Sequence, residues 1–373
     1  MESESKLRVL HLTTLHPGFD PRIYWKEARS LAAAGYEVHF AGPDAQQAPD
    51  RSVQVHLLER PSNGLRRIVG STNEALRVVA EASPDIVHFH DPELLPVGIL
   101  LRRRGIATVY DAHEDLTNQV SHKPYIHRRL RRLAGASVGA VERTLASRMS
   151  AVVAATDQIA ARHGNARLLA TVRNFPLESE FPKKSVANQD RENTAIYIGT
   201  ITRERGILEL VNAAEQFHKD VGARLVLAGP IHGDGFAEEL AALEGWRYVD
   251  HTPWLDRREV SDQLSRAGCG LVTLLPSPSY LESLPVKMFE YMASGLPVVA
   301  SDFPLWRPLV GDAGVMVDPT DPRDIAHGVV RILSDEDAAS SMSSAGRLAF
   351  EQKYSWESER RRLEVLYAEL PDI

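Results

Sequence analysis

Short apolar runs alternate with helix-length segments along nearly all of this chain, and this alternation limits the fold more than any other feature. In the first half, we predict buried strands at Leu7–Thr13, Glu37–Ala41, Ile86–Phe89, Ala107–Tyr110, Ala151–Ala154 and Leu168–Val172. In the second half, we predict them at Ala195–Ile198, Arg224–Ala228, Gly270–Leu274, Val298–Ala300 and Gly314–Val317. Apolar strands separated by helices are typical of parallel sheets covered on both faces. The pattern therefore predicts an α/β protein.

One polar segment, 174–193, follows neither the strand period nor the helix period, and we predict that it is a linker. The predicted domains are then 1–173, 194–352 and a final helix at 353–373. A chain of 373 residues is long enough for two domains with separate cores. Ligands of open parallel sheets bind beyond the carboxyl ends of the strands, so the loops that follow strands are where functional residues are expected.

Composition is that of an ordinary globular protein, with 25% charged and 43% hydrophobic residues. The net charge of -7 argues against nucleic acid as the main partner. Cys269 is the one cysteine and lies in an apolar run, which predicts a buried thiol and no internal disulfide. Neither a signal sequence nor a membrane-spanning apolar stretch is present, and we expect a cytoplasmic protein.

The most informative local sequence is Tyr280–Asp302, in which Glu282 and Glu290 are separated by seven residues. Pro285 is predicted as the first residue of a helix running to about Ser294, because a missing N–H is tolerated there and the fixed φ is helical. The free N–H groups of that first turn would bind an anion such as a diphosphate. Carboxylates on either side of the anion can accept hydrogen bonds from sugar hydroxyls. This arrangement suits an enzyme that uses a nucleotide sugar.

This segment resembles the Glu-x7-Glu signature of the retaining glycosyltransferases of family 4, the group 1 glycosyltransferases, and the following Ala-x-Gly-x-Pro-Val-Val-Ala-Ser-Asp is similar too. The resemblance implies the GT-B fold: two Rossmann-like domains facing a cleft, with the C-terminal helix returning to the first domain. It also implies that Glu282 holds hydroxyls of the transferred sugar and that Glu290 holds the ribose. An ordinary amphipathic helix feeding a buried strand is the alternative.

The start of the second domain, Tyr197–Ile207, is similar to the family's Gly-Arg-x5-Lys-Gly motif, whose cations neutralise the donor diphosphate. Here Thr200 replaces the Arg and Arg205 fills the Lys position, where its planar fork suits phosphate oxygens. Lys287 or Arg203 would compensate for the lost cation. The alternative to a phosphate-binding role for Arg205 is that it is an ordinary surface arginine at a helix N-terminus. Pro285 stands where the family commonly has Gly, so backbone contacts to phosphate are expected from the two residues after it. The donor-binding residues predicted in this domain are Gly199, Thr200, Arg205, Glu282, Leu284, Pro285, Val286, Lys287 and Glu290.

The loop His16–Arg22 follows the first predicted strand and precedes a predicted helix at Ile23–Ala34. The resemblance implies that this loop meets both the diphosphate and the acceptor. We therefore predict Gly18 as a donor contact and Asp20 and Arg22 as acceptor contacts. Helix capping and turn formation are equally open for Asp20 and Arg22.

A second loop, Val109–Asp115, resembles the family's strand-end histidine motif, which implies that His113 contacts the transferred sugar. With Glu282 and Arg205 it completes the predicted catalytic set. His88 and His90 alternate across a strand, so His88 is expected in the core and His90 is an acceptor candidate.

The histidines also raise a metal centre as an alternative, since imidazole and carboxylate groups are metal ligands. The five residues concerned are His88, His90, Asp91, His113 and Glu114. Their spacing matches no closed site, and no Asp-x-Asp follows a strand. We therefore predict no metal and no other cofactor.

The segment 123–148 is basic, and its apolar residues recur at roughly helical spacing. Its basic residues are Lys123, Arg128, Arg129, Arg131, Arg132, Arg143 and Arg148; its apolar residues are Leu130, Leu133, Val138, Val141, Leu145 and Met149. If the acceptor is lipid-linked, this surface would contact the inner face of the membrane. A solvated charged face over a core face is the equal alternative.

These features predict a retaining glycosyltransferase that moves a sugar from a nucleotide diphosphate sugar to a hydroxyl acceptor, which is a glycan, a lipid-linked compound or a small molecule. Two alternatives stay open: a nucleotide-sugar epimerase of the same fold, and a non-catalytic nucleotide-sugar-binding protein, which Thr200 and Pro285 favour. The base, the sugar, the acceptor and the oligomeric state are not defined by the sequence.

Overall fold

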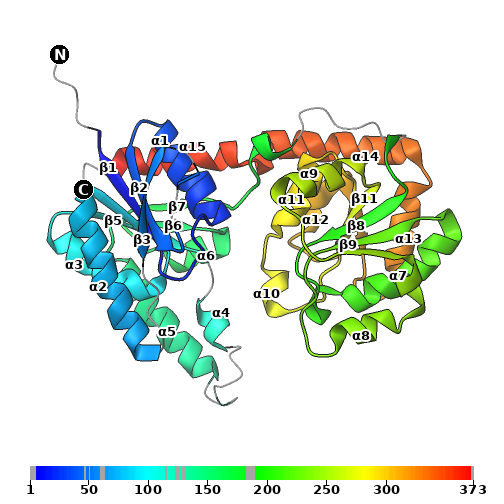
Figure 1. Ribbon diagram of the computed structural model, residues 1–373, viewed down its shortest axis with the longest axis horizontal. Helices are drawn as coiled ribbons and strands as arrows, with labels where there is room; N and C mark the ends of the chain where they lie inside the picture. The colour runs from blue at the N-terminus through cyan, green and yellow to red at the C-terminus, as the bar shows by residue number, and fades with distance from the viewer. Residues whose placement is uncertain are drawn as a thin grey trace. The chain divides into compact units, whose positions relative to one another are not determined.

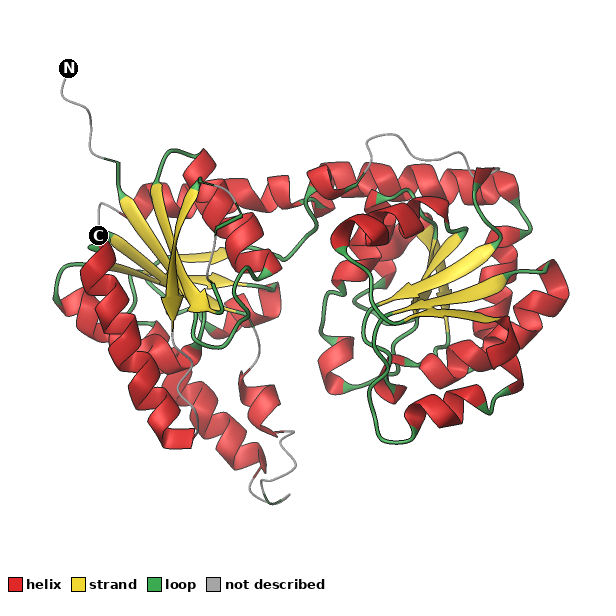
Figure 2. Cartoon of the chain, viewed as in Figure 1, coloured by secondary structure: helices red, strands yellow, loops and turns green. Residues whose placement is uncertain are grey.

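The chain forms two compact α/β units in a computed structural model, which describes residues 6–45, 48–49, 51–58, 64–113, 116–121, 127, 131–181 and 190–370. Unit 1 comprises Met1–Asn174 and Glu359–Ile373, and unit 2 comprises Phe175–Ser358. Each unit is a parallel sheet with helices packed on it (Figure 1 and Figure 2). The prediction of two Rossmann-like domains is confirmed.

Unit 1 has a seven-stranded sheet in the order β3-β2-β1-β4-β5-β6-β7. Its strands are β1 (Arg8–Leu12), β2 (Glu37–Pro43), β3 (Val53–Leu58), β4 (Ile86–Phe89), β5 (Ala107–Ala112), β6 (Ala151–Ala154) and β7 (Leu169–Thr171). Its helices are α1 (Arg29–Ala33), α2 (Gly64–Ala82), α3 (Leu95–Arg103), α4 (Leu116–Ser121), α5 (Arg131–Ala146) and α6 (Asp157–Arg162). The strand order reverses between β1 and β4, which is where an open parallel sheet binds its ligands.

Unit 2 has a six-stranded sheet in the order β10-β9-β8-β11-β12-β13, with the reversal between β8 and β11. Its strands are β8 (Thr194–Ile198), β9 (Arg224–Ala228), β10 (Val249–Thr252), β11 (Cys269–Val272), β12 (Val298–Ser301) and β13 (Gly314–Val317). Its helices are α7 (Ile207–Val221), α8 (Phe236–Ala241), α9 (Arg257–Arg266), α10 (Pro278–Leu281), α11 (Val286–Ala293), α12 (Arg307–Val310), α13 (Pro322–Leu333) and α14 (Glu336–Ala349). None of the described helices is long and apolar enough to cross a membrane.

All of the predicted strands are present, and the sequence missed only β3 and β10 among the described strands. Both are edge strands, and both carry polar residues: β3 is Val-Gln-Val-His-Leu-Leu and β10 is Val-Asp-His-Thr. An edge strand is partly open to solvent, so its sequence lacks the continuous apolar run that marks a central strand. Cys269 is fully buried in β11, as predicted.

The helix expected at Ile23–Ala34 differs from the prediction because its first part is a π-helix, Pro21–Ala28, followed by α1. Asp20 caps this π-helix by accepting hydrogen bonds from the N–H groups of Arg22 (2.8 Å) and Ile23 (3.1 Å). Arg22, Lys26 and Glu27 of the π-helix are all buried. Three charged side chains are thereby placed inside the domain rather than on its surface.

Asn174, the first residue of the predicted linker, belongs to unit 1, and the residues from Phe175 on belong to unit 2. Phe175 and Phe181 lie in the apolar core of unit 2, so this part is not a free connector. Residues 182–189 of that linker lie outside the described residues. The last helix, α15 (Trp356–Glu369), contributes Glu359 and the residues after it to unit 1. There the Tyr367 hydroxyl lies 2.8 Å from Nδ1 of His88.

Candidate functional site

The helix α11 begins one residue later than the sequence suggested. Pro285 is its N-cap, with φ −72° and ψ 113°, and Val286 is its first helical residue. Proline fixes φ but leaves ψ free, and the extended ψ keeps Pro285 outside the helix. The N–H groups of Val286 and Lys287 have no acceptor four residues earlier within the helix, so this turn can bind an anion. α11 ends at Ala293, with Ser294 as its C-cap.

The two carboxylates around α11 have different environments. Glu282 is exposed at the C-terminal end of α10. Glu290 is 8% exposed, and its Oε1 accepts a hydrogen bond of 2.8 Å from the Arg257 guanidinium. Arg257 also pairs with Glu180. Glu290 is therefore held in place by the protein, whereas Glu282 faces solvent.

Two cations, Arg205 and Lys287, converge beside the glycine that follows β8. Gly199 has a φ of 130°, and a Cβ built on it would lie 3.1 Å from Nζ of Lys287 and 3.4 Å from a terminal nitrogen of Arg205. A side chain at this position would therefore stand between the two charges. Glycine is required there both by its backbone conformation and by this close approach.

The Lys287 ammonium is buried without a hydrogen-bond acceptor among the described residues, although the residue as a whole is only half-buried. It lies 3.7 Å from the centre of the Tyr197 ring, and Arg205 donates a 3.4 Å hydrogen bond to the Tyr197 hydroxyl. Burial and then the charge of Arg205 lower the pKa of Lys287 well below its ordinary value, while Glu290 raises it. Two adjacent cations beside a helix N-terminus form a site for an anionic ligand.

The other donor-binding predictions have simpler surroundings. Arg203 pairs with Glu239 and lies over the Phe236 ring at 4.7 Å, so Lys287 and not Arg203 is the cation beside Arg205. The backbone oxygen of Thr200 accepts a 2.9 Å hydrogen bond from the Tyr197 hydroxyl. Leu284 is half-buried and packs against the apolar core of unit 2.

The His16–Arg22 loop is built largely by contacts inside unit 1. A Cβ on Gly18 would lie 2.6 Å from the Pro43 oxygen and 2.8 Å from the Ala45 nitrogen, so backbone packing explains this glycine. Asp20 has the capping role that was the alternative to acceptor binding.

The Arg22 side chain is 3% exposed, and the structure directs it into the domain rather than toward an acceptor. It makes two hydrogen bonds of 3.0 Å to the Asp111 carboxylate and one of 2.8 Å to the Val172 oxygen. It also lies 2.9 Å from Oε1 of Glu27. The capping and turn roles left open by the sequence therefore account for Asp20, and an internal ion pair accounts for Arg22.

His113 lies directly after β5, with its side chain 14% exposed. Its Nε2 is 3.1 Å from Oδ2 of Asp111 and 3.0 Å from Nδ1 of His90. The ring is thus oriented by neighbours inside unit 1 while one edge stays open. His90 itself is 2% exposed, which places this acceptor candidate inside the domain.

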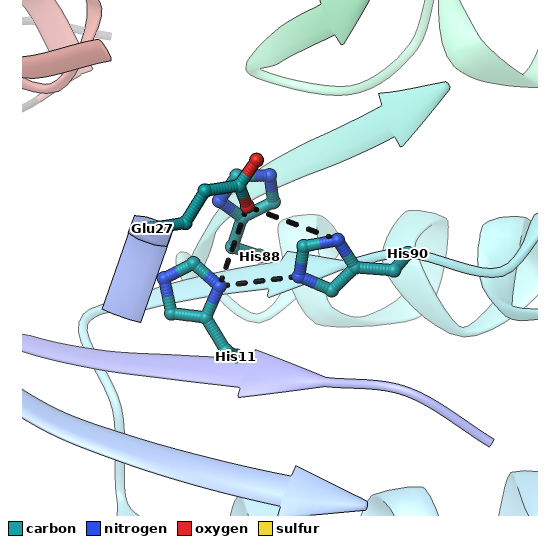
Figure 3. A group of neighbouring side chains, drawn as sticks. All are labelled: His11, Glu27, His88 and His90. Atoms are coloured by element: carbon teal, nitrogen blue, oxygen red, sulfur yellow. Dashed lines mark hydrogen bonds and ion pairs between the residues drawn. The ribbon is translucent and has the colours of Figure 1, made fainter. Parts of the chain in front are cut away.

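Four side chains that are distant in sequence form a buried cluster: His11, Glu27, His88 and His90 (Figure 3). His88 was expected in the core and is fully buried. His11 of β1 and Glu27 of the π-helix were missed, although His11 is the register partner of His88 across β1 and β4. That pairing is the signal that would have identified His11, and it requires the strand order.

Burial dominates the protonation of this cluster. It lowers the pKa of His11 and His88 well below the ordinary value and lowers that of His90 to about 4. Burial, and then the charge of Asp111, raise the pKa of Glu27 well above its usual range. Of the other metal candidates, Asp91 accepts hydrogen bonds from Thr13 and Thr14, and Glu114 lies outside the described residues.

The basic segment is only partly described, since Lys123, Arg128, Arg129 and Leu130 lie outside the described residues. In α5, Leu133 is 66% exposed and Val141 is 58% exposed. Helical spacing suggested that the apolar residues of this segment form one core face. The exposure of Leu133 and Val141 shows that not all of them do. Met149 does lie in the core of unit 1, and Leu145 packs against it.

Comparisons with known proteins agree along the chain. The model of the family "Glycosyl transferase 4-like domain" matches residues 24–172, and that of "Glycosyl transferases group 1" matches residues 178–349. The α-maltose-1-phosphate synthase of Mycobacterium tuberculosis is 33% identical over 173 residues, which are 43% of this chain and 44% of that protein. The chain spans less than half the length of the curated relatives it matches, 42% to 45% for the first three.

Two solved structures show the same fold. A sucrose-phosphate synthase from Thermosynechococcus elongatus has a TM-score of 0.74 at 18% identity, covering 98% of this chain and 99% of its own. Anabaena HepE in complex with UDP and glucose has a TM-score of 0.68 at 15% identity, covering 97% of this chain and 99% of its own. At these identities the likeness defines the fold alone.

Proposed function

Because this chain belongs to the group 1 glycosyltransferases of the GT-B fold, we propose that it transfers a sugar from a nucleotide diphosphate sugar to a hydroxyl acceptor with retention of anomeric configuration. The observation that supports this best is the convergence of Arg205, Lys287 and the N-terminus of α11 around Gly199. A donor diphosphate carries the negative charge that would pair with these cations and with the N–H groups of the helix N-terminus.

The same groups would stabilise the leaving nucleotide. As the sugar–oxygen bond breaks, negative charge grows on the diphosphate, and fixed cations and backbone N–H groups lower the energy of that state. The departing phosphate oxygen then takes the proton of the acceptor hydroxyl, so no side chain is needed as general base. This scheme uses no metal ion at the diphosphate, and we expect donor hydrolysis to continue in excess EDTA without added magnesium or manganese.

The remaining donor contacts follow from the two carboxylates and from His113. Glu290, held by Arg257, is proposed to accept hydrogen bonds from the ribose hydroxyls. Glu282 is proposed to hold the hydroxyls of the transferred sugar, and His113 to contact the same sugar. Since HepE was solved with UDP and glucose, UDP-sugars are the first donors to test, followed by those of GDP, dTDP and ADP.

The acceptor is left as three alternatives: a glycan, a lipid-linked compound or a small molecule. Exposed Leu133 and Val141 on the arginine-bearing helix α5 favour contact with an anionic lipid surface, with the enzyme on the inner face of the membrane. Sedimentation with anionic vesicles, compared between wild type and a Leu133→Ser, Val141→Ser variant, tests this. Equal sedimentation of the two proteins would leave α5 without a membrane role.

Product analysis tests the function itself. The protein is first screened by thermal shift against UDP-, GDP-, dTDP- and ADP-sugars, and the stabilising donor is then incubated with and without an acceptor mixture. A glycoside with the anomeric configuration of the donor is expected. A sugar with inverted ring stereochemistry, formed without acceptor, would identify an epimerase. Tight donor binding without turnover in any acceptor mixture would identify a binding protein.

A further inference from the structure

The cluster of His11, Glu27, His88 and His90 contains a full set of metal ligands inside unit 1. One donor atom from each of the four side chains lies within 4.8 Å of the others, and all four residues are at most 2% exposed. His11 comes from β1, Glu27 from the π-helix, and His88 from β4, with His90 directly after it. Figure 3 shows the Glu27 carboxylate pointing toward the rings of His11 and His90. Three segments therefore meet at this one point.

Several polar atoms of the cluster are buried without a hydrogen-bond partner among the described residues. They are Nε2 of His11, Nε2 of His88 and Oε2 of Glu27, whereas Oε1 of Glu27 is paired with the Arg22 guanidinium. A buried polar atom with no partner destabilises a folded protein, and such atoms are rare. A metal ion bound by Nε2 of His88 and Oε2 of Glu27 would satisfy two of these atoms.

Side chains around the cluster orient three of these four groups. Nδ1 of His90 lies 3.2 Å from the Asp111 carboxylate, which leaves its Nε2 facing Nδ1 of His11 at 3.1 Å. Nδ1 of His88 lies 2.8 Å from the Tyr367 hydroxyl. Oε1 of Glu27 lies 2.9 Å from the Arg22 guanidinium. Metal-binding histidines usually have such a partner on the second ring nitrogen.

We propose that this cluster binds one divalent transition-metal ion, with zinc as the preferred ion, in a closed structural site made by His11, Glu27, His88 and His90. Three imidazoles and one carboxylate suit zinc, and a tetrahedral site is the usual structural form. No position is left open for a substrate, because all four side chains are buried. The ion joins β1, β4 and the π-helix, and this role is independent of the glycosyltransferase reaction.

The distances agree with a small contraction on binding. Ligand atoms of a tetrahedral zinc ion lie about 3.3 Å apart, given bonds of about 2.0 to 2.1 Å. His11 and His90 are already at 3.1 Å, and Oε2 of Glu27 is 3.9 Å from Nδ1 of His11. Rotation of side chains brings the remaining atoms closer.

A second group, His90, Asp111 and His113, is a weaker candidate. Asp111 is already bound by both sides of the Arg22 fork, and His113 is partly exposed. Asp111 and His113 are better placed as outer partners of His90 than as ligands themselves.

The test uses the full chain, purified without a polyhistidine tag, saturated with zinc and then freed of excess metal by gel filtration. Elemental analysis should find about one zinc per chain, and cobalt in place of zinc should give the strong visible absorption of a tetrahedral site. Glu27→Gln should lose the bound metal. Tyr367→Phe, which removes only the outer partner of His88, should weaken zinc binding by about tenfold.

A second histidine pair in the same sheet provides the control. Nδ1 of His39 lies 2.8 Å from Nε2 of His56, and this pair is outside the cluster. His56→Asn should retain the full metal content. The proposal is overturned if wild type holds no zinc after gel filtration, or if His56→Asn loses as much as Glu27→Gln. The zinc content of the wild-type protein is measured without any variant. The proposal can therefore be contradicted even if a variant fails to fold.

Discussion

The candidate donor site of unit 2 and the histidine cluster of unit 1 lie at the same place in two similar sheets, yet they differ in charge and exposure. Each is found where the strand order reverses, beside β8 and β11 in one unit and on β1 and β4 in the other. Arg205 follows β8, and Lys287 lies on α11. The site that they form is partly open. His11 and His88 are strand residues and are fully buried.

This difference shows how a Rossmann-like sheet separates binding from internal stabilisation. Side chains from loops and helix starts beyond the strands can reach a soluble ligand, and they can keep charge that the protein does not neutralise. Strand side chains at the same edge are enclosed by helices, so their polar groups need partners inside the protein.

The largest effect is expected in unit 2, from Arg205→Ala. Removing a fixed charge from the leaving diphosphate should slow transfer by about ten- to a thousandfold, a loss of a few kcal/mol in the transition state. The control is Arg203→Ala, since Arg203 already pairs with Glu239 and faces Phe236. Initial rates with the donor found by thermal shift give the comparison. Wild-type rates in both variants would place the diphosphate elsewhere.

The two carboxylates should separate binding from turnover. Glu290→Ala is expected to weaken nucleotide binding, because Glu290 is the carboxylate assigned to the ribose, whereas Glu282→Ala should chiefly lower kcat. Loss of a charged hydrogen-bond acceptor costs roughly 1.5 to 3 kcal/mol. Calorimetric titration with the free nucleotide and steady-state kinetics give the two quantities. The assignment fails if both variants keep the wild-type affinity and the wild-type kcat.

The contrast also explains which features could be predicted from sequence. The central strands were found because a buried parallel strand is a continuous apolar run, and β4, β6 and β9 have the predicted bounds. The edge strand β13, Gly-Val-Met-Val, was found too because its residues are apolar. Arg205 was found because a motif preserves the spacing of loop residues along the chain, whereas the second cation was left open between Lys287 and Arg203 until the structure placed Lys287 there. The edge strands β3 and β10 were missed because partial exposure removes the apolar pattern.

The histidine cluster could not be predicted, since its members are brought together by strand order and by an irregular helix. His11 and His88 are 77 positions apart in sequence but adjacent in the β1–β4 register. Glu27 lies four residues from Ile23 and from Leu31, and it is buried with them. A charged residue at such a position is usually exposed, so its residue type alone gave no reason to expect a buried carboxylate.

Donor binding should take up a proton through Lys287. In the free protein its pKa is held well below the ordinary value by burial and by Arg205. A bound diphosphate favours the charged ammonium and raises this pKa, so affinity should fall as the pH rises through the free-state pKa. Titration calorimetry in buffers of different ionisation enthalpy measures the uptake. Lys287→Met should abolish it, and equal proton uptake by that variant would remove Lys287 from the site.

The smallest effect is on stability without ligand, and it follows from the same buried cation. The unfolded chain binds a proton on Lys287 up to its ordinary pKa of about 10.4, whereas the folded protein releases that proton at a lower pH. Between these two values the wild-type free energy of unfolding therefore rises with pH.

Lys287→Met removes the unfavourable burial, so near neutral pH the variant should be more stable by about 1 kcal/mol. This advantage should shrink in alkaline buffer, where wild-type Lys287 is neutral. Urea unfolding of both proteins at neutral and alkaline pH measures the difference. If the difference in free energy of unfolding between the two proteins stayed constant with pH, packing and not the buried charge would be its cause.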